Sequence, residues 1–193
     1  MTFTITNIYD NLINKISIKN PKNMVSYLIL AFIIFIIIVF LFYIKKTISY
    51  NVINCNSISK LFTSKPPLIS AVDSPELSNH SLRDFYIKSA YNCCCSGKFK
   101  NDYVNICALD SCIEQGVRML DFEIYSIDNK PVVAASSIDS YKTKETYNSI
   151  PIEEVFSTIN QKAFSSGSCP NYNDPLILHF RISSKNVQMY NAL

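Results

Sequence analysis

The feature that most constrains this chain of 193 residues is a long apolar stretch near its N-terminus. Residues 24–44 read MVSYLILAFIIFIIIVFLFYI, without a charged side chain. About twenty apolar residues are needed for a helix to cross the roughly 30 Å hydrocarbon core of a bilayer. A signal peptide usually has a shorter apolar region closer to the N-terminus, followed by a small-residue cleavage site. A buried core helix is rarely so uniformly apolar. We therefore predict one transmembrane helix over residues 24–44.

The charges around this stretch leave its orientation open. Lys15, Lys19 and Lys22 precede it, and Lys45 and Lys46 follow it, so the positive-inside rule barely discriminates between the two orientations. The formal net charge is only +3, and most of the excess lies beside the apolar stretch. The sequence therefore predicts a membrane as partner and gives no support for binding to nucleic acid.

Composition divides the rest of the chain into three segments. Residues 1–23 are polar and rich in Asn and Lys. Residues 45–80 mix Asn, Ser, Lys and Pro, as in TSKPPLISAVDSPELSN, and are typical of a linker or stalk. Over residues 81–193, stretches with the apolar spacing of strands alternate with stretches of helical spacing. This alternation predicts an α/β domain.

The domain is expected to contain four strands and at least two complete helices. A turn is predicted at SIDNK, because Asp and Asn tolerate left-handed backbone conformations. Pro151 is expected at a first helical position. The strands are apolar on both faces, which is typical of a parallel sheet covered by helices. The strands are predicted at 83–91, 117–125, 131–135 and 174–182, and the helices at 101–116, 151–164 and from 186 onward.

The strand at 117–125 carries two acids in an apolar setting. Asp121 and Glu123 are two residues apart, so both side chains point to the same face of the strand. Two carboxylates about 4 Å apart repel each other by roughly 4 kcal/mol at an effective dielectric constant of 20. We therefore expect a cation beside the pair, or one acid that stays protonated.

Four stretches of the domain resemble a known family. YIKSAYN, GVRMLDFEIYSIDNKPVV, PIEEVFSTI and DPLILHFRIS, in this order within residues 82–186, are similar to the X region of phosphoinositide-specific phospholipases C and the wider PLC-like phosphodiesterases. They look most like the version carried by giant double-stranded DNA viruses. The resemblance implies part of a TIM-type (β/α) barrel, whose chemistry lies at the carboxyl ends of the strands.

The resemblance also implies catalytic positions, and this chain departs from both. The first strand of active members ends in a His-Asn pair, and Tyr91 stands where that His is expected. The third strand leads to a second catalytic His, and Ala135 stands there. Phosphodiester attack needs a group that moves protons near neutral pH, which His does. Neither Tyr91 nor Ala135 supplies such a group.

The metal positions implied by the resemblance are partly kept. Asn92 matches the calcium-binding Asn, and Asp121 and Glu123 match an acid-x-acid pair. Arg181 stands where a calcium-binding Glu is expected. A guanidinium removes one ligand and repels the ion. We therefore predict a vestigial calcium site without a cofactor, in which Arg181 bridges the carboxylates in place of the metal.

The length of the domain raises a further point. About four strand–helix units fit between residues 82 and 193, whereas a closed barrel needs eight units and about 250 residues. An exposed edge of a parallel sheet would promote aggregation. We therefore expect the N-terminal half of a longer barrel, rather than a half barrel completed by a partner.

These expectations combine into two functional hypotheses. The first is a single-pass membrane protein with a degenerate, non-catalytic PLC-like domain. Such a protein would be a binding or structural component of a viral membrane or virion. Its partners would be phospholipid headgroups or other virion and capsid proteins. The alternative is an active phosphoric diester hydrolase on phospholipid headgroups that uses groups such as His179 and Tyr91. Released inositol phosphate would distinguish the two.

Other chemistry-bearing residues have simpler interpretations. His179 is expected to be a core histidine hydrogen-bonded inside the barrel, and Lys142 and Lys144 to lie in a solvated loop over its mouth. Asn79-His80-Ser81 matches the N-glycosylation pattern, which is short and often met by chance. The seven cysteines show no CxxC spacing, so a zinc site has little support. They are buried thiols, or disulfides if the domain faces an oxidising compartment.

Overall fold

The computed structural model describes residues 21–63, 69, 71–72, 75, 79–138 and 143–193. The chain divides into two compact units, Met1–Ser49 and Tyr50–Leu193, and each is described by itself. Most of the polar segment predicted at 1–23, including Lys15 and Lys19, lies outside the described residues, as does Lys142.

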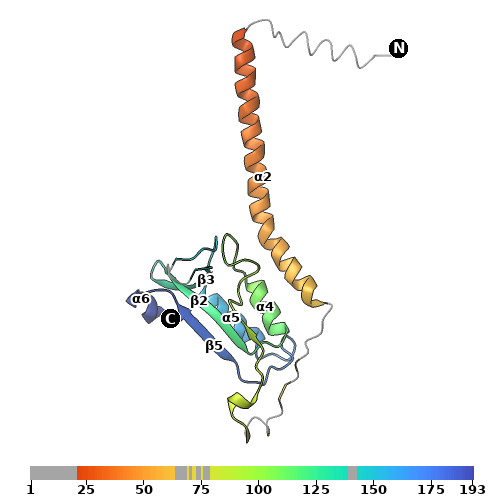
Figure 1. Ribbon diagram of the computed structural model, residues 1–193, viewed down its shortest axis with the longest axis vertical. Helices are drawn as coiled ribbons and strands as arrows, with labels where there is room; N and C mark the ends of the chain where they lie inside the picture. The colour runs from red at the N-terminus through yellow and green to blue at the C-terminus, as the bar shows by residue number, and fades with distance from the viewer. Residues whose placement is uncertain (1–20, 64–68, 70, 73–74, 76–78, 139–142) are drawn as a thin grey trace, which may run out of the picture. The chain divides into compact units, whose positions relative to one another are not determined.

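The first unit contains most of helix α2 (Pro21–Thr63) (Figure 1). Its residues Met24–Lys46 form a helix long and apolar enough to cross a membrane, and the most apolar 18 residues have a mean hydropathy of 3.2. The helix continues beyond the end expected for the apolar stretch, so the first half of the segment 45–80 is helical and not an irregular linker. No Gly or Pro interrupts residues 45–63, and the first helix-breaking pair is Pro66-Pro67.

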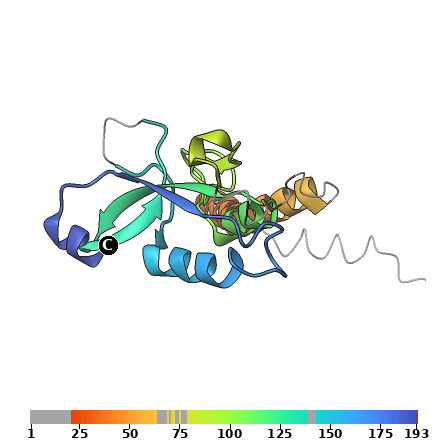
Figure 2. The ribbon, with the colours of Figure 1, turned by 90° about the horizontal axis from the view of Figure 1, so that it is seen from below.

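The second unit is built around the long strand β2 (Met119–Ile127), which is buried along most of its length. Strands β1 (Ser89–Ala90) and β5 (Ile177–Ile182) pair with β2 in parallel. Strand β3 (Lys130–Ala134) pairs with β2 in antiparallel fashion, and β4 (Ile150–Pro151) pairs antiparallel with β3. The five strands form one mixed, curled sheet, a half barrel (Figure 2). A closed barrel is not formed by the described residues.

The all-parallel sheet expected from the sequence is therefore wrong for β3, which runs antiparallel to its neighbours β2 and β4. Asp128 and Asn129 have φ angles of 50° and 63°, and the register pairs Ile127 with Lys130. A two-residue loop with both φ angles positive joins antiparallel strands with the correct twist. The predicted turn is confirmed, and its geometry makes β2 and β3 a hairpin.

Two helices cover one face of the sheet. Helices α4 (Ile106–Glu114) and α5 (Ile152–Lys162) pack their apolar sides against β2 and β5 (Figures 1 and 2). Phe122 stacks on Phe180 with ring centroids 5.8 Å apart, and Phe156 of α5 meets Phe180 edge-on. This side of the sheet carries the main hydrophobic core, which leaves the opposite face for polar side chains.

The element boundaries differ from the expectations in several places. The predicted strand at 83–91 is shortened to β1, preceded by the 3-10 helix η1 (Leu82–Asp84). Asn105 caps α4 by accepting a hydrogen bond from the backbone N–H of Cys107, and Gly116 follows the helix at φ 72°. Pro151 is the N-cap of α5, not its first helical residue. A short helix, α6 (Val187–Ala192), ends the chain.

A disulfide joins the C-terminal part of α2 to α4 within the second unit. Cys55 and Cys107 are bonded, with their Cα atoms 5.8 Å apart. Beside them, the Asn54 side chain donates a 3.0 Å hydrogen bond to Asp102. The five remaining cysteines are free thiols, and three of them, Cys93, Cys94 and Cys169, are buried as the sequence predicted. The other predicted possibility, a disulfide, applies to Cys55 and Cys107.

Candidate functional site

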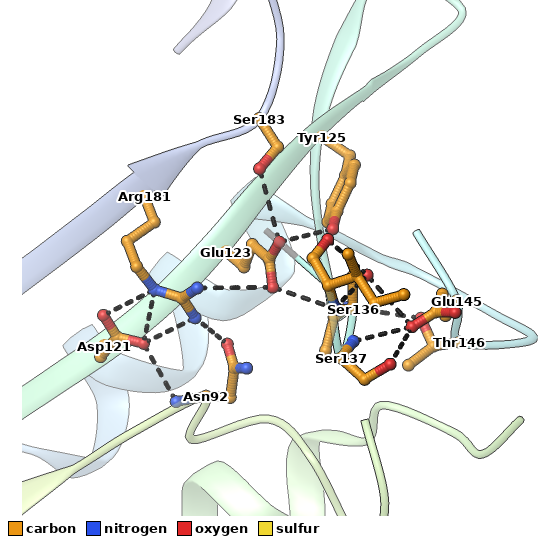
Figure 3. A network of polar contacts seen from close by, with 12 residues as sticks. Asn92, Asp121, Glu123, Tyr125, Ser136, Ser137, Glu145, Thr146, Arg181 and Ser183 are labelled. Carbon is orange, nitrogen blue, oxygen red and sulfur yellow. Dashed lines mark hydrogen bonds and ion pairs between the residues drawn. The ribbon is translucent and has the colours of Figure 1, made fainter. Parts of the chain in front are cut away.

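The candidate site lies on the face of the sheet opposite the helices, and its side chains come from β2, β5 and the segment that follows β1 (Figure 3). In the parallel pairing of β2 and β5, Asp121 is opposite His179, and Glu123 is opposite Arg181. Partners in register point to the same face of a sheet, so these four side chains gather on one surface. Asn92 approaches them from the end of β1, where its backbone N–H donates a 3.1 Å hydrogen bond to Asp121.

Arg181 is the centre of this cluster. Its Nη2 lies 3.1 Å from Asp121 Oδ1, and its Nη1 lies 3.6 Å from Glu123 Oε2. Nη2 also donates a 2.6 Å hydrogen bond to Asn92 Oδ1. The side chains of Asp121 and Glu123 are only 8% and 2% exposed. The structure thus brings Asn92, Asp121, Glu123 and Arg181 together, with the guanidinium between the two carboxylates.

Glu123 has further partners that hold it in place. The Tyr125 hydroxyl donates a 2.5 Å hydrogen bond to Glu123 Oε1, and the Ser136 backbone N–H donates one of 3.2 Å to Oε2. The Ser183 hydroxyl lies 3.4 Å from Oε1. Each carboxylate oxygen of this buried acid therefore has at least one donor, which offsets the cost of removing it from water.

These contacts shift the protonation equilibria of the cluster. Burial alone would raise the pKa of Asp121, but hydrogen bonds from Arg181, His179 and the Asn92 backbone outweigh it and hold that pKa below its usual value. Burial would likewise lower the pKa of Arg181, and its contacts with Asp121 raise it instead. Burial and the bond to Glu123 raise the pKa of Tyr125. At neutral pH the cluster contains an ionised Asp121, a charged Arg181 and a neutral Tyr125.

The donor set does not fit the calcium ion of the resembling family. Calcium takes six to eight oxygen ligands, several of them from carboxylates. Here Asn92, Asp121 and Glu123 each direct a side-chain oxygen to the Arg181 guanidinium, and the other Glu123 oxygen accepts from Tyr125 and Ser183. Among the described residues, no group of three or more His, Cys, Asp or Glu side chains is arranged to hold a metal ion.

At the two positions where the resemblance predicts catalytic histidines, the chain has Tyr91 and Ala135. The Tyr91 ring lies under Arg181, with 4.4 Å between the guanidinium carbon and the ring centroid, and Tyr91 is 57% exposed. Ala135 is fully buried, and its carbonyl accepts hydrogen bonds from the backbone N–H groups of Glu145 and Thr146. The next residue, Ser136, bonds Glu145 through its hydroxyl.

His179 is not the core histidine expected from the sequence. Its side chain is 52% exposed, and its Nδ1 lies 2.6 Å from Asp121 Oδ2. Residues 179 and 181 share the polar face of β5, while Phe180 points to the core. His179 is therefore a solvent-accessible imidazole beside a buried carboxylate.

The described residues of the loop after β3 are held by contacts within the loop and with Lys100. Lys144 donates to the carbonyls of Thr146 and Tyr147 at 2.7 and 3.3 Å, so it does not extend freely over the site as a solvated loop lysine would. Glu145 forms a 3.0 Å ion pair with Lys100 and accepts hydrogen bonds from Ser137. These hydrogen bonds, followed by the Lys100 contact, lower the pKa of Glu145 to about 2.

Sequence reasoning missed three members of the cluster. Tyr125 and Ser183 each lie two residues beyond a predicted site residue on the same strand or its extension, so the period of two could have found them. The Ser136 contact uses a backbone N–H, for which a sequence has no signal.

Comparison with models of known protein families finds no match for this chain, and no curated protein sequence matches it.

Proposed function

We propose that this chain is a single-pass membrane protein whose second unit is a degenerate PLC-like phosphodiesterase domain with a structural, non-catalytic role. The observation that carries the proposal is the position of Arg181 between Asp121 and Glu123, with Asn92 on the same guanidinium. The helix over Met24–Lys46 supports the membrane anchor. A place in a viral membrane or virion rests on the family resemblance alone.

The chemistry of the site supports an inactive domain. Hydrolysis of a phosphodiester needs a side chain that accepts and donates protons near neutral pH, and Tyr91 and Ala135 occupy the two positions where the family resemblance implies such a side chain. Arg181 is already paired with two carboxylates, so its charge is not free for a phosphate. The remaining acidity of the cluster would repel an anionic headgroup, which favours assembly with other proteins over lipid recognition at this site.

An enzymatic assay tests the proposal directly. We would incubate the full chain, reconstituted in vesicles containing phosphatidylinositol, with and without calcium, and measure released inositol phosphate. We expect no release above that of protein-free vesicles. Release that Asp121→Asn abolishes would contradict the proposal, because it would assign turnover to this site.

The alternative, an active hydrolase, is favoured by one observation. His179 is exposed and its Nδ1 lies 2.6 Å from Asp121, the arrangement in which a carboxylate orients a histidine for proton transfer. If this pair were catalytic, His179→Ala would remove the activity, whereas His80→Ala, a change of the chain's other histidine, would leave it intact. The same assay therefore separates the two functions.

A further inference from the structure

The disulfide between Cys55 and Cys107 bears on the compartment in which the second unit lies. The two residues are 52 positions apart in the chain, and the bond connects α2 to α4. Disulfides persist in oxidising compartments and are rare where glutathione and thioredoxin keep thiols reduced. A structural disulfide therefore indicates a domain that faces the endoplasmic reticulum lumen or the exterior.

The remaining thiols are compatible with such a compartment. Cys93, Cys94 and Cys169 are buried, and Cys95 and Cys112 are half-buried. Burial raises the pKa of Cys93, and it raises that of Cys95 to about 12 and that of Cys112 to about 11. Because the thiolate is the form that attacks disulfides, these protonated thiols would exchange slowly with the Cys55–Cys107 bond.

The glycosylation pattern at Asn79 lies in the same part of the chain. Asn79-His80-Ser81 is the only Asn-x-Ser/Thr sequence in the 193 residues, and Asn79 and Ser81 are both exposed. The pattern follows the candidate membrane-spanning segment Met24–Lys46, as do both bonded cysteines. With a single crossing, the sequon and the disulfide lie on the same side of the membrane.

We propose that Asn79 is an N-glycosylation site, and that the second unit faces the lumen or exterior while the N-terminus faces the cytosol. The inference goes beyond the proposed function, because it does not depend on whether the Arg181 cluster binds or hydrolyses anything. It also gives the membrane orientation that the flanking lysines leave open. The modifying group is an oligosaccharide attached to the Asn79 amide nitrogen, delivered during synthesis from a lipid-linked donor with release of the lipid carrier.

The test uses the full chain with a C-terminal tag, expressed in cultured mammalian cells. Digestion with an enzyme that removes N-glycans is expected to increase the gel mobility of the wild type by one step. Asn79→Gln and Ser81→Ala are expected to migrate like the digested protein, whereas Ser81→Thr retains the pattern and the shift. Asn160→Gln, at an exposed asparagine outside any such pattern, serves as the matched control and also retains the shift.

Two further measurements keep a negative result informative. In denatured, unreduced protein a maleimide reagent is expected to label five thiols, and seven after reduction. Protease added to sealed microsomes is expected to leave the tagged domain intact. If digestion does not change the mobility of the wild-type protein, Asn79 is not glycosylated and that part of the proposal is wrong. The proposed orientation is wrong as well if two further results accompany the unshifted band. These are digestion of the tagged domain in sealed microsomes and labelling of seven thiols before reduction.

Discussion

At the scale of single residues, the arrangement around Arg181 answers a problem of charge. Asp121 and Glu123 are buried side by side on β2, and two such carboxylates destabilise each other unless a cation lies between them. The guanidinium is suited to this place because its planar fork contacts both acids and Asn92 at once. The stack on the Tyr91 ring adds a further favourable contact on its open side.

Replacing Arg181 tests whether its charge stands in for a metal ion. Arg181→Gln removes the cation without adding a ligand, and we expect it to lower the free energy of unfolding by about 3 kcal/mol, because a buried ion pair is broken. Arg181→Glu adds a third carboxylate, and we expect calorimetry to detect calcium binding that the wild type and Arg181→Gln lack. Equal calcium binding by both variants, or by neither, would contradict this role.

The pH dependence of stability tests the same cluster. The pKa of Asp121 is lower in the folded chain than its ordinary value of about 3.9, so ionised Asp121 stabilises the fold. This contribution is fully present above about pH 5 and is lost as the pH falls through the folded-state pKa. We therefore expect the difference in unfolding free energy between wild type and Asp121→Asn, measured by urea denaturation, to shrink below about pH 4. A difference that does not change with pH would show that the charge of Asp121 does not contribute.

At the scale of elements, the β2–β3 hairpin brings Ser136 into the candidate site. The turn at Asp128 and Asn129 returns the chain beside β2, so that Ser136 reaches Glu123 with its backbone N–H. A parallel β3 would need a longer crossover and would place this segment elsewhere. The turn therefore contributes to the candidate site although neither of its residues touches it.

Substitutions at Asp128 test this turn. Asp128 is exposed and has a φ of 50°, which β-branched residues adopt only with strain. We expect Asp128→Val to lower the free energy of unfolding by about 1–2 kcal/mol, and Asp128→Gly to leave it nearly unchanged. Thermal or urea denaturation measures both. Equal destabilisation by the two changes would indicate that the side chain, and not the backbone angle, matters.

The elements also show how far the sequence predicts the fold and the site. The period of two along β2 correctly placed Asp121 and Glu123 on one face, and the family resemblance pointed to Asn92 and Arg181 as their neighbours. The direction of β3 was wrong, because a strand buried on both faces has the same apolar pattern in parallel and antiparallel sheets. The exposure of His179 was also missed, since it depends on what covers the polar face and not on β5 itself.

At the scale of the whole molecule, the Cys55–Cys107 disulfide links the far end of the long helix to the sheet-bearing part of the second unit. The hydrogen bond from Asn54 to Asp102 reinforces this link from the preceding residue. The segment expected to be a linker or stalk is thus in part a component of the folded unit.

Reduction tests the contribution of this bond. A cross-link between residues 52 positions apart restricts the unfolded chain by about 4 kcal/mol in the loop-entropy treatment. We expect dithiothreitol to lower the unfolding free energy of the wild type by about 2–4 kcal/mol and to leave a Cys55→Ser variant unaffected. A similar loss in that variant would assign the effect to another thiol.

The enclosure of the Arg181 cluster has a consequence for its response to ionic strength. At 1 M salt the screening length in water falls to about 3 Å, which weakens exposed pairs such as Arg83–Asp84, whose side chains are 87% and 45% accessible. Mobile ions cannot enter between Arg181 and its buried acids in the same way. Concentrated salt is therefore expected to weaken ion pairs on the surface of this domain much more than those around Arg181.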